Sequence, residues 1–159
     1  MENKAMVVVD ENGEVMESAI QSVPAMSDLF SAESAAVFTS EGLIFDDTPA
    51  GKFALHKIKT SPAYKLSNER GKTLKITGFI CQWVQVKSRV TGELETAPRI
   101  ILVDENGEGH VCVSNGMLNA LKMIVQDVGQ PSKELPFTVK IGSGKTDKGE
   151  FLTLELVGI

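Results

Sequence analysis

The chain has 159 residues, of which 42% are hydrophobic and 23% are charged. This composition is typical of an ordinary globular domain and excludes a wholly disordered or fibrous protein. The sequence contains no apolar run of about eighteen residues and no basic, apolar start of the signal-peptide type. We therefore expect a cytoplasmic protein that does not contact a membrane.

The net charge of −5 is divided unevenly along the chain. Residues 1–50 contain ten acidic residues and one lysine, a balance of −9, whereas residues 51–159 contain fifteen bases and eleven acids, a balance of +4. We interpret 1–50 as an acidic, partly ordered N-terminal arm and 51–159 as the folded domain. Because a polyanion responds to the local field of the surface that it meets, the overall negative charge does not exclude nucleic acid as a partner.

The clearest structural signals begin at Lys72. Alternation of apolar residues and turn residues predicts strands over about 73–87, 99–103, 110–113, 137–141 and 151–157. One helix is predicted over 115–128, with Ser114 or Asn115 as its N-cap and Gly129 at its end. Weaker patterns suggest a helix over about 26–37 and a strand over about 53–58.

The order of these elements is β-β-β-α-β-β, with a long first strand that has Gly78 near its middle, where a bend or bulge is easily accommodated. This order resembles the OB-fold, a five-stranded barrel with a single helix between strands three and four. The predicted class is therefore all-β with one helix, with the barrel core at 72–159 behind the acidic arm.

Alternation along the first strand suggests which side chains face the solvent. The even positions are mostly aliphatic and are assigned to the barrel interior. The odd positions place Phe79 and Trp83 on the outer face, between Lys75 at one end and Lys87 and Arg89 at the other. Exposed aromatics beside cations are typical of surfaces on which unpaired bases stack while phosphates meet Lys and Arg. The alternative is that Phe79 and Trp83 pack under the N-terminal segment or against a second subunit.

The same alternation predicts an outward Phe151 on the last strand and an outward Arg99 in the hairpin, where His110 is a weaker candidate. The glycine-rich segment 142–149 carries Lys145 and Lys148, whose flanking glycines allow backbone amides to approach phosphates. Tyr64, close to Lys65 and Arg70, would extend the binding track or act as a local packing anchor.

Catalysis finds little support in the sequence. His56 and His110 lack metal-ligand spacing, no GxSxG motif occurs, and Cys81 and Cys112 lie too far apart in the chain for a CxxC motif. We expect no enzyme activity, no catalytic residues, no metal and no cofactor.

Together, the strand segment 74–86, the turn at 104–107, the helix 115–128 and the Gly/Lys hairpin 142–149 resemble a single-stranded-DNA-binding protein, similar in size to those that bacteriophages encode for replication. The resemblance implies sequence-tolerant binding and protection of single strands during replication or recombination, in the host cytoplasm if a phage encodes the chain. By position, it implies base stacking on Phe79, Trp83 and Phe151. It also implies phosphate contacts from Lys75, Lys87, Arg89, Arg99, Lys145 and Lys148.

Several points stay open at this stage. RNA is an alternative ligand, self-association is undecided, and the acidic arm is expected either to recruit replication proteins or to cover the basic groove. The rival interpretation is an OB-fold interaction or structural module whose aromatic face meets a subunit or a protein partner, because a fold does not determine a function.

Overall fold

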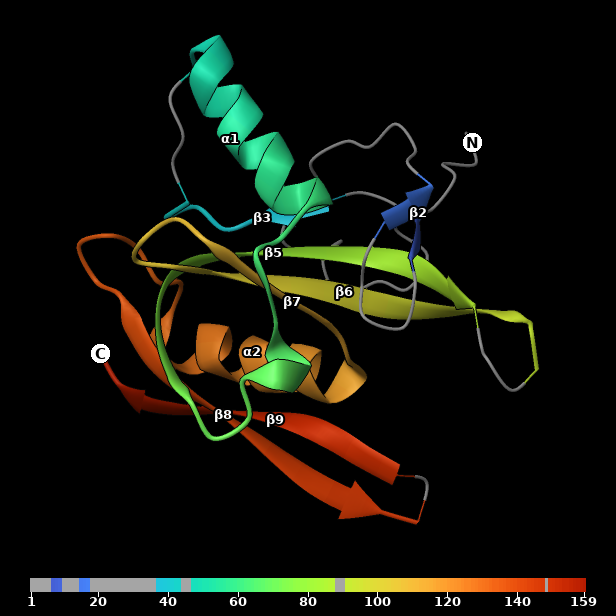
Figure 1. Cartoon of the computed structure of the whole chain (residues 1–159). Helices are drawn as coiled ribbons and strands as arrows, with labels where there is room; N and C mark the ends of the chain where they lie inside the picture. The colour runs from blue at the N-terminus through green and yellow to red at the C-terminus, as the bar shows by residue number, and fades with distance from the viewer. Residues whose placement is uncertain (1–6, 10–14, 18–36, 44–46, 88–90, 148) are drawn as a thin grey trace.

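The computed structural model describes residues 7–9, 15–17, 37–43, 47–87, 91–147 and 149–159 (Figure 1). The helix predicted over about 26–37 lies almost entirely outside these residues. The strands are β1 (Val7–Val9), β2 (Val15–Glu17), β3 (Val37–Thr39), β4 (Tyr64–Lys65), β5 (Thr73–Lys87), β6 (Leu94–Asp104), β7 (Gly109–Val113), β8 (Phe137–Thr146) and β9 (Gly149–Gly158). The helices are α1 (Pro49–Thr60), the short 3₁₀ helix η2 (Leu66–Asn68) and α2 (Asn115–Val128).

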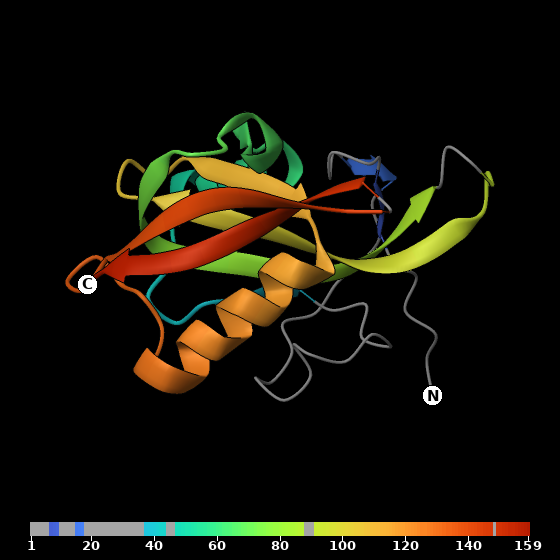
Figure 2. The same ribbon diagram turned by 90° about the horizontal axis from the view of Figure 1, so that it is seen from below.

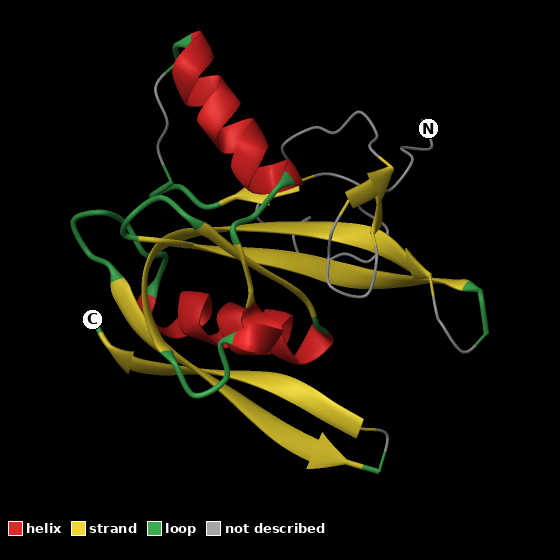
Figure 3. Cartoon of the chain, in the orientation of Figure 1, coloured by secondary structure: helices red, strands yellow, loops and turns green. Residues whose placement is uncertain are grey.

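The strands form one strongly curled sheet in which β5 is the central strand. β5 pairs with β6 along most of its length and with β8 at its start, while β1 and β3 add to it from the N-terminal part of the chain. Figure 3 shows α1 and α2 on opposite sides of this sheet. The mainly β character is confirmed, but the described part of the chain has two α-helices and more than five strands.

The segment from β5 to β9 follows the predicted order β-β-β-α-β-β, and the predicted bounds of β5 and α2 are confirmed. Among the residues that the structure describes, β7 and β9 form no ladder with each other, so the sheet is a half-barrel. The specific OB topology therefore stays a prediction.

Helix α2 begins and ends as its sequence suggests. The hydroxyl of Ser114 accepts a hydrogen bond from the backbone N–H of Met117 at 3.2 Å, and Gly129 ends the helix at a φ of 96°, which favours glycine. Met117, Leu118 and Leu121 are buried on the side that faces the sheet. The helix therefore closes the concave side of the half-barrel and completes its main core.

A β-bulge between Ile76 and Gly78 changes which residues of β5 face the core. The extra residue shifts the alternation by one, because side chains on a regular strand change face at every position. Ile76 before the bulge and Phe79, Cys81 and Trp83 after it consequently belong to the same core cluster. The prediction that the odd positions face the solvent is wrong beyond the bulge, although a bulge near Gly78 was itself expected.

The opposite face of β5, β6 and β7 is also covered. Ile80 and Ile101 pack in a second cluster with Ile58 of α1 and Val37 of β3. The strand predicted over 53–58 is wrong, because these residues lie in α1. The helix begins at a Thr48 N-cap, whose hydroxyl accepts from the Gly51 N–H at 3.1 Å.

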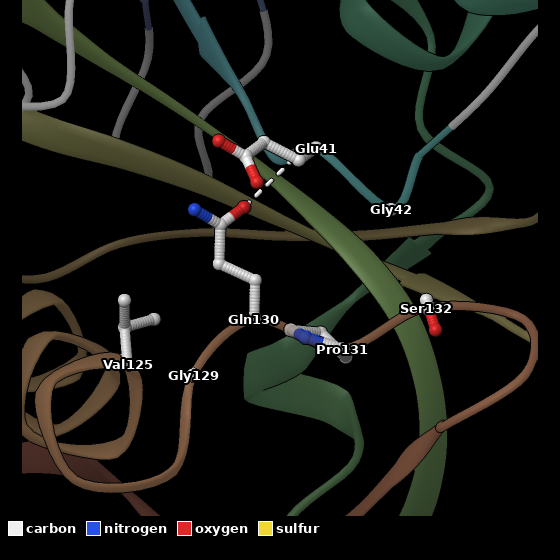
Figure 4. A pocket seen from close by; sticks show the side chains of 7 residues that line it. All are labelled: Glu41, Gly42, Val125, Gly129, Gln130, Pro131 and Ser132. Atoms are coloured by element: carbon white, nitrogen blue, oxygen red, sulfur yellow. Dashed lines mark hydrogen bonds between the residues drawn. The ribbon is translucent and has the colours of Figure 1, made fainter.

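Residues 37–43 are fastened to the rest of the domain (Figure 4). The Glu41 N–H donates to the Gln130 side chain at 2.8 Å, and Gly42 forms a bridge with Ser132 in the loop that follows α2. A Cβ atom on Gly78 would lie 2.8 Å from the Leu43 Cβ, so glycine permits this close approach. The division of the chain at residue 50 stays a prediction, but part of the segment before it belongs to the sheet.

Candidate nucleic-acid interface

Two of the three aromatic residues expected to stack on bases are buried. Phe79 is fully buried and stacks on Phe38 of β3, with ring centroids 5.9 Å apart. Trp83 is 9% exposed and belongs to the main core. The predicted exposure of both residues is therefore wrong, because the bulge turns them into the main core that α2 completes. For Phe79, the N-terminal segment supplies part of this packing through Phe38, as the alternative had it.

Arg99 is also buried, with 1% of its surface exposed. It lies on the face of β6 opposite the main core, as its position suggests, but α1 covers that face. One guanidinium nitrogen donates to the carbonyl oxygen of Lys59 at 2.7 Å, and a cation is favourable near the C-terminal end of a helix. Arg99 thus fastens α1 to the sheet, and its predicted exposure is wrong. His110 is likewise buried.

Phe151 is the stacking candidate that the structure leaves exposed. Leu154 on β9 is buried, whereas Phe151 points outward with 43% of its surface exposed, so the predicted alternation of this strand is confirmed. Phe151 lies opposite Gly144 on β8. A Cβ atom on Gly144 would be 2.9 Å from two ring carbons of Phe151. The ring therefore covers this glycine and can do so only because glycine has no side chain.

The segment 142–149 is mostly a strand pair rather than a flexible loop, because β8 continues to Thr146 and β9 starts at Gly149. The resulting arm projects from the half-barrel (Figure 1). Lys145 lies 3.8 Å from the Glu150 carboxylate, which also forms an ion pair with Arg70 from the loop after η2. Arg70 therefore links this arm to the segment that carries Tyr64. Lys148 lies outside the described residues.

Tyr64 is 45% exposed and stacks on His110 at a centroid distance of 4.9 Å and an interplanar angle of 22°. His110 is held from both sides, with Nδ1 2.5 Å from Glu69 and Nε2 2.8 Å from Asp104. The Asp104 carboxylate also accepts two backbone N–H groups of the β6–β7 turn. A hydrogen bond to Glu108 raises the pKa of the Tyr64 hydroxyl, with further contributions from nearby carboxylates. One ring face of Tyr64 is thus fixed on a rigid base, while much of the residue stays exposed.

No local sequence pattern indicates this network, because Glu69 and His110 are 41 positions apart in the chain. Their meeting depends on the parallel pairing of β4 with β7, which periodicity does not reveal. Tyr64 was predicted either to extend the DNA-binding surface or to act as a local packing anchor. Its stacking on His110 shows that it packs locally, and its DNA contact stays a prediction.

The other predicted cations lie apart from one another. Lys75 is exposed and 3.9 Å from Glu105, and Lys87 is exposed at the end of β5. Arg89 lies outside the described residues. Lys87 stands where β5 and β6 form a second arm, and Figures 1 and 2 show both arms extending toward the same side of the molecule.

Comparison with known protein families gives one match. The family model described as phage single-stranded DNA-binding protein matches residues 37–157. The chain belongs to this family. The match begins at β3 and ends in β9, so it includes the strand whose Phe38 stacks on Phe79. The searches of curated proteins and of solved structures gave no match.

Membership of the phage single-stranded DNA-binding protein family confirms the resemblance predicted from the sequence and implies binding of single-stranded DNA. The family is one of DNA-binding proteins. Among the described residues, no helix is long and apolar enough to cross a membrane.

For a phage single-stranded DNA-binding protein, exposed aromatic side chains are the natural positions for base contacts. In the described part of the chain, these are Phe53 on α1, Tyr64 on β4 and Phe151 on β9. Tyr64 and Phe151 were among the binding residues predicted from the sequence. Phe53 was missed because its segment was interpreted as a strand, although Thr48-Pro49 is a recognisable start of a helix.

Proposed function

We propose that the protein coats single-stranded DNA during phage replication or recombination, with little dependence on base sequence. Bases stack on Phe151 and on Tyr64, and Lys145 and Arg70 contact phosphates between them. Lys75 and Lys87 are further phosphate contacts nearer to the sheet. Phe79, Trp83 and Arg99 take no direct part, because they are buried.

The observation that carries this proposal is the position of Phe151. A large apolar side chain on a projecting arm, 43% exposed, gains little from the core, and an exposed ring face is available to a base. Cations from two segments, Lys145 and Arg70, meet at the adjacent Glu150. Every base presents a π face, so such a surface binds single strands without selecting a sequence.

The test is a titration of labelled oligo(dT), followed by fluorescence anisotropy, with a duplex of equal length and oligo(rU) as competitors. Phe151→Leu keeps an apolar side chain but removes the ring, and we expect affinity to fall about fivefold or more, because stacking contributes about 1 to 3 kcal/mol per base. Leu135→Ala is a matched control, because Leu135 is 48% exposed in the loop before β8. Equal affinity of Phe151→Leu and the wild type would refute base stacking on the arm.

The competitors separate the remaining alternatives. Strong competition by oligo(rU) would make RNA a second ligand, and absence of any complex with either strand would favour the protein-interaction module. Competition by the duplex as strong as that by the single strand would contradict stacking, because bases in a duplex are already stacked on one another.

We also propose that the acidic residues of 1–50 compete with DNA for the basic surfaces or recruit replication proteins. Deletion of 1–50 is a poor test, because Val9 is fully buried beside Val84 and β3 pairs with β5. Replacing the acids of 1–36 by their amides keeps the strands. If the acids compete, this variant binds oligo(dT) more tightly at low salt and equally at high salt. Equal affinity at low salt would refute the competition.

A further inference from the structure

Helix α1 is fixed to the sheet by one of its faces. Ile58 is buried in the cluster that covers β6 and β7, with Leu55 packed against it, and Arg99 holds the Lys59 carbonyl oxygen in the last turn. Burial lowers the pKa of the Lys59 ammonium, which therefore lies near this inner face. The helix has a defined orientation, so its opposite face points away from the sheet.

The outward face of α1 combines one aromatic residue with cations. Lys52, Phe53, His56 and Lys57 are exposed, and their spacing of one, four and five positions places them on one side of a helix. Phe53 is 66% exposed, the largest value among the large hydrophobic residues that the structure describes. A side chain of this size that is so exposed makes little contribution to the core.

The charge of this face differs from that of the β8–β9 arm. Residues 48–68 contain four lysines and one histidine and no acidic residue. Asp47, just before the helix, lies 3.2 Å from Lys52, and that pair is highly exposed. On the arm, by contrast, Lys145 and Arg70 share the carboxylate of Glu150. The α1 face is thus a locally basic surface with an aromatic residue in its middle.

The end of α1 is also close to Tyr64 along the chain, although Tyr64 stacks on His110 on the other face of the sheet, at its edge strand β4. Helix α1 ends at Thr60, and the chain reaches Tyr64 within four residues, so Phe53 lies about 10 Å of helix length before that end. Figure 1 shows the end of α1 leading directly into the segment that carries β4 and η2. A strand that stacks on Tyr64 at this edge is therefore near the end of α1, and it reaches the basic face of the helix by passing around the edge strand β4.

We propose that the outward face of α1 is a second contact region for single-stranded DNA, in which a base stacks on Phe53 and Lys52 and Lys57 contact phosphates. The proposal rests on the proposed function and extends the bound strand from Tyr64 to α1. A polyanion is the occupant that the chemistry favours, because protein interfaces are depleted in lysine and this face is rich in it. A second copy that contributes its acidic segment is the competing occupant.

The experiment is an affinity series with oligo(dT) from about 4 to about 20 nucleotides, a range that spans the sites of OB-type domains. We expect Phe53→Ala to bind the shortest oligonucleotides like the wild type and the longest about fivefold or more weakly. Met123→Ala is the matched control, since Met123 is 62% exposed on α2. Both substitutions replace an exposed helical residue by alanine, so both variants should fold.

The phosphate contacts have a separate readout. With long oligonucleotides, Lys57→Gln should make the dependence of log affinity on log salt shallower by about 0.7, and Lys133→Gln should leave it unchanged. Lys133 is exposed in the loop after α2.

The outcomes distinguish this inference from the proposed function. Wild-type affinity of Phe53→Ala at every length, with a defect in Phe151→Leu, would overturn the α1 contact and leave the arm. A smaller mass of Phe53→Ala in light scattering without DNA, with unchanged DNA affinity, would overturn it in favour of a contact between copies. Loss of affinity only on long strands, with unchanged mass, would support it. Absence of binding by the wild type would reject the proposed function itself.

Discussion

Substitution of Gly144 by alanine tests the arm without removing any side chain that touches DNA. A Cβ at this position would overlap with the Cζ atom of Phe151 and lie 2.9 Å from its Cε1 and Cε2 atoms, whereas an ordinary contact needs about 3.5 Å or more. The ring has room to move, because Phe151 is 43% exposed. We therefore expect the ring to swing away from the strand pair and to lose the orientation in which it presents its face to a base.

We expect a small effect on stability and a large effect on DNA affinity. Gly144 does not have a positive φ, and alanine within a strand is about 0.5 to 1 kcal/mol more favourable than glycine, so displacement of the ring is partly offset. The melting temperature should change by only a few degrees. If the base stack is lost, the affinity for oligo(dT) falls about 5- to 150-fold, which corresponds to about 1 to 3 kcal/mol.

Gly158→Ala is the matched control, because its Cβ would lie 3.6 Å from Thr138 on the same pair of strands, an ordinary contact. Anisotropy titrations and thermal unfolding are recorded for both variants and for Gly144→Ala combined with Phe151→Leu. The double variant should bind no more weakly than Phe151→Leu alone, because both changes act on the same ring. Wild-type affinity of Gly144→Ala beside a defect in Phe151→Leu would refute the reasoning about ring orientation.

Three further predictions concern the buried residues. Trp83 is 9% exposed, so saturating oligo(dT) should change its fluorescence little while anisotropy reports binding; strong quenching would contradict its burial. Cys81 and Cys112 should react with a disulfide-exchange reagent only after unfolding, because burial raises both pKa values, that of Cys112 to about 12. The folded state keeps these protons while unfolded thiols lose them near pH 9.0, so stability is full below pH 9 and falls as the pH rises toward 12. Arg99→Met should lower the free energy of unfolding by about 1 to 3 kcal/mol in denaturant titrations and leave the affinity of the folded protein unchanged; weakened binding would instead place Arg99 at the DNA.

The local elements of the C-terminal part were predictable because their signals are local. Helix α2 has its cap at Ser114, its apolar face and its terminal Gly129 within sixteen residues, and β5 has fifteen residues of strand-forming sequence. Helix α1 was missed because the short segment 53–58 does not distinguish a helical period from a strand. Only the N-terminal Thr48-Pro49 signal separates the two interpretations.

The faces of β5 were not predictable by alternation, because one bulged residue reverses every later assignment. Phe79 and Trp83, which were expected at the surface, therefore lie in the core. Arg99 is buried for a different reason: its face of β6 was assigned correctly, but α1 covers that face. Coverage of a sheet by a distant segment is a tertiary property that the pattern of the strand itself does not contain. The exposure of Phe151 was predicted correctly because β9 is regular where the ring lies and the described residues leave its outer face open.

Burial of β5 on both faces determines how the protein should respond to salt. In the proposed function the DNA contacts lie on the arm and not on the sheet. Lys145 and Arg70 share Glu150 there, so the net charge of these three side chains is about +1. A single strand loses about 0.7 in log affinity per log unit of salt for each phosphate neutralised, so binding confined to the arm should depend weakly on salt, because stacking supplies most of the affinity. The α1 face adds Lys57, and Lys52 beside Asp47, in a stretch without acids. The salt dependence should therefore become steeper as the oligonucleotide grows long enough to reach Lys75, Lys87 and α1, and a slope independent of length would place every phosphate contact on the arm.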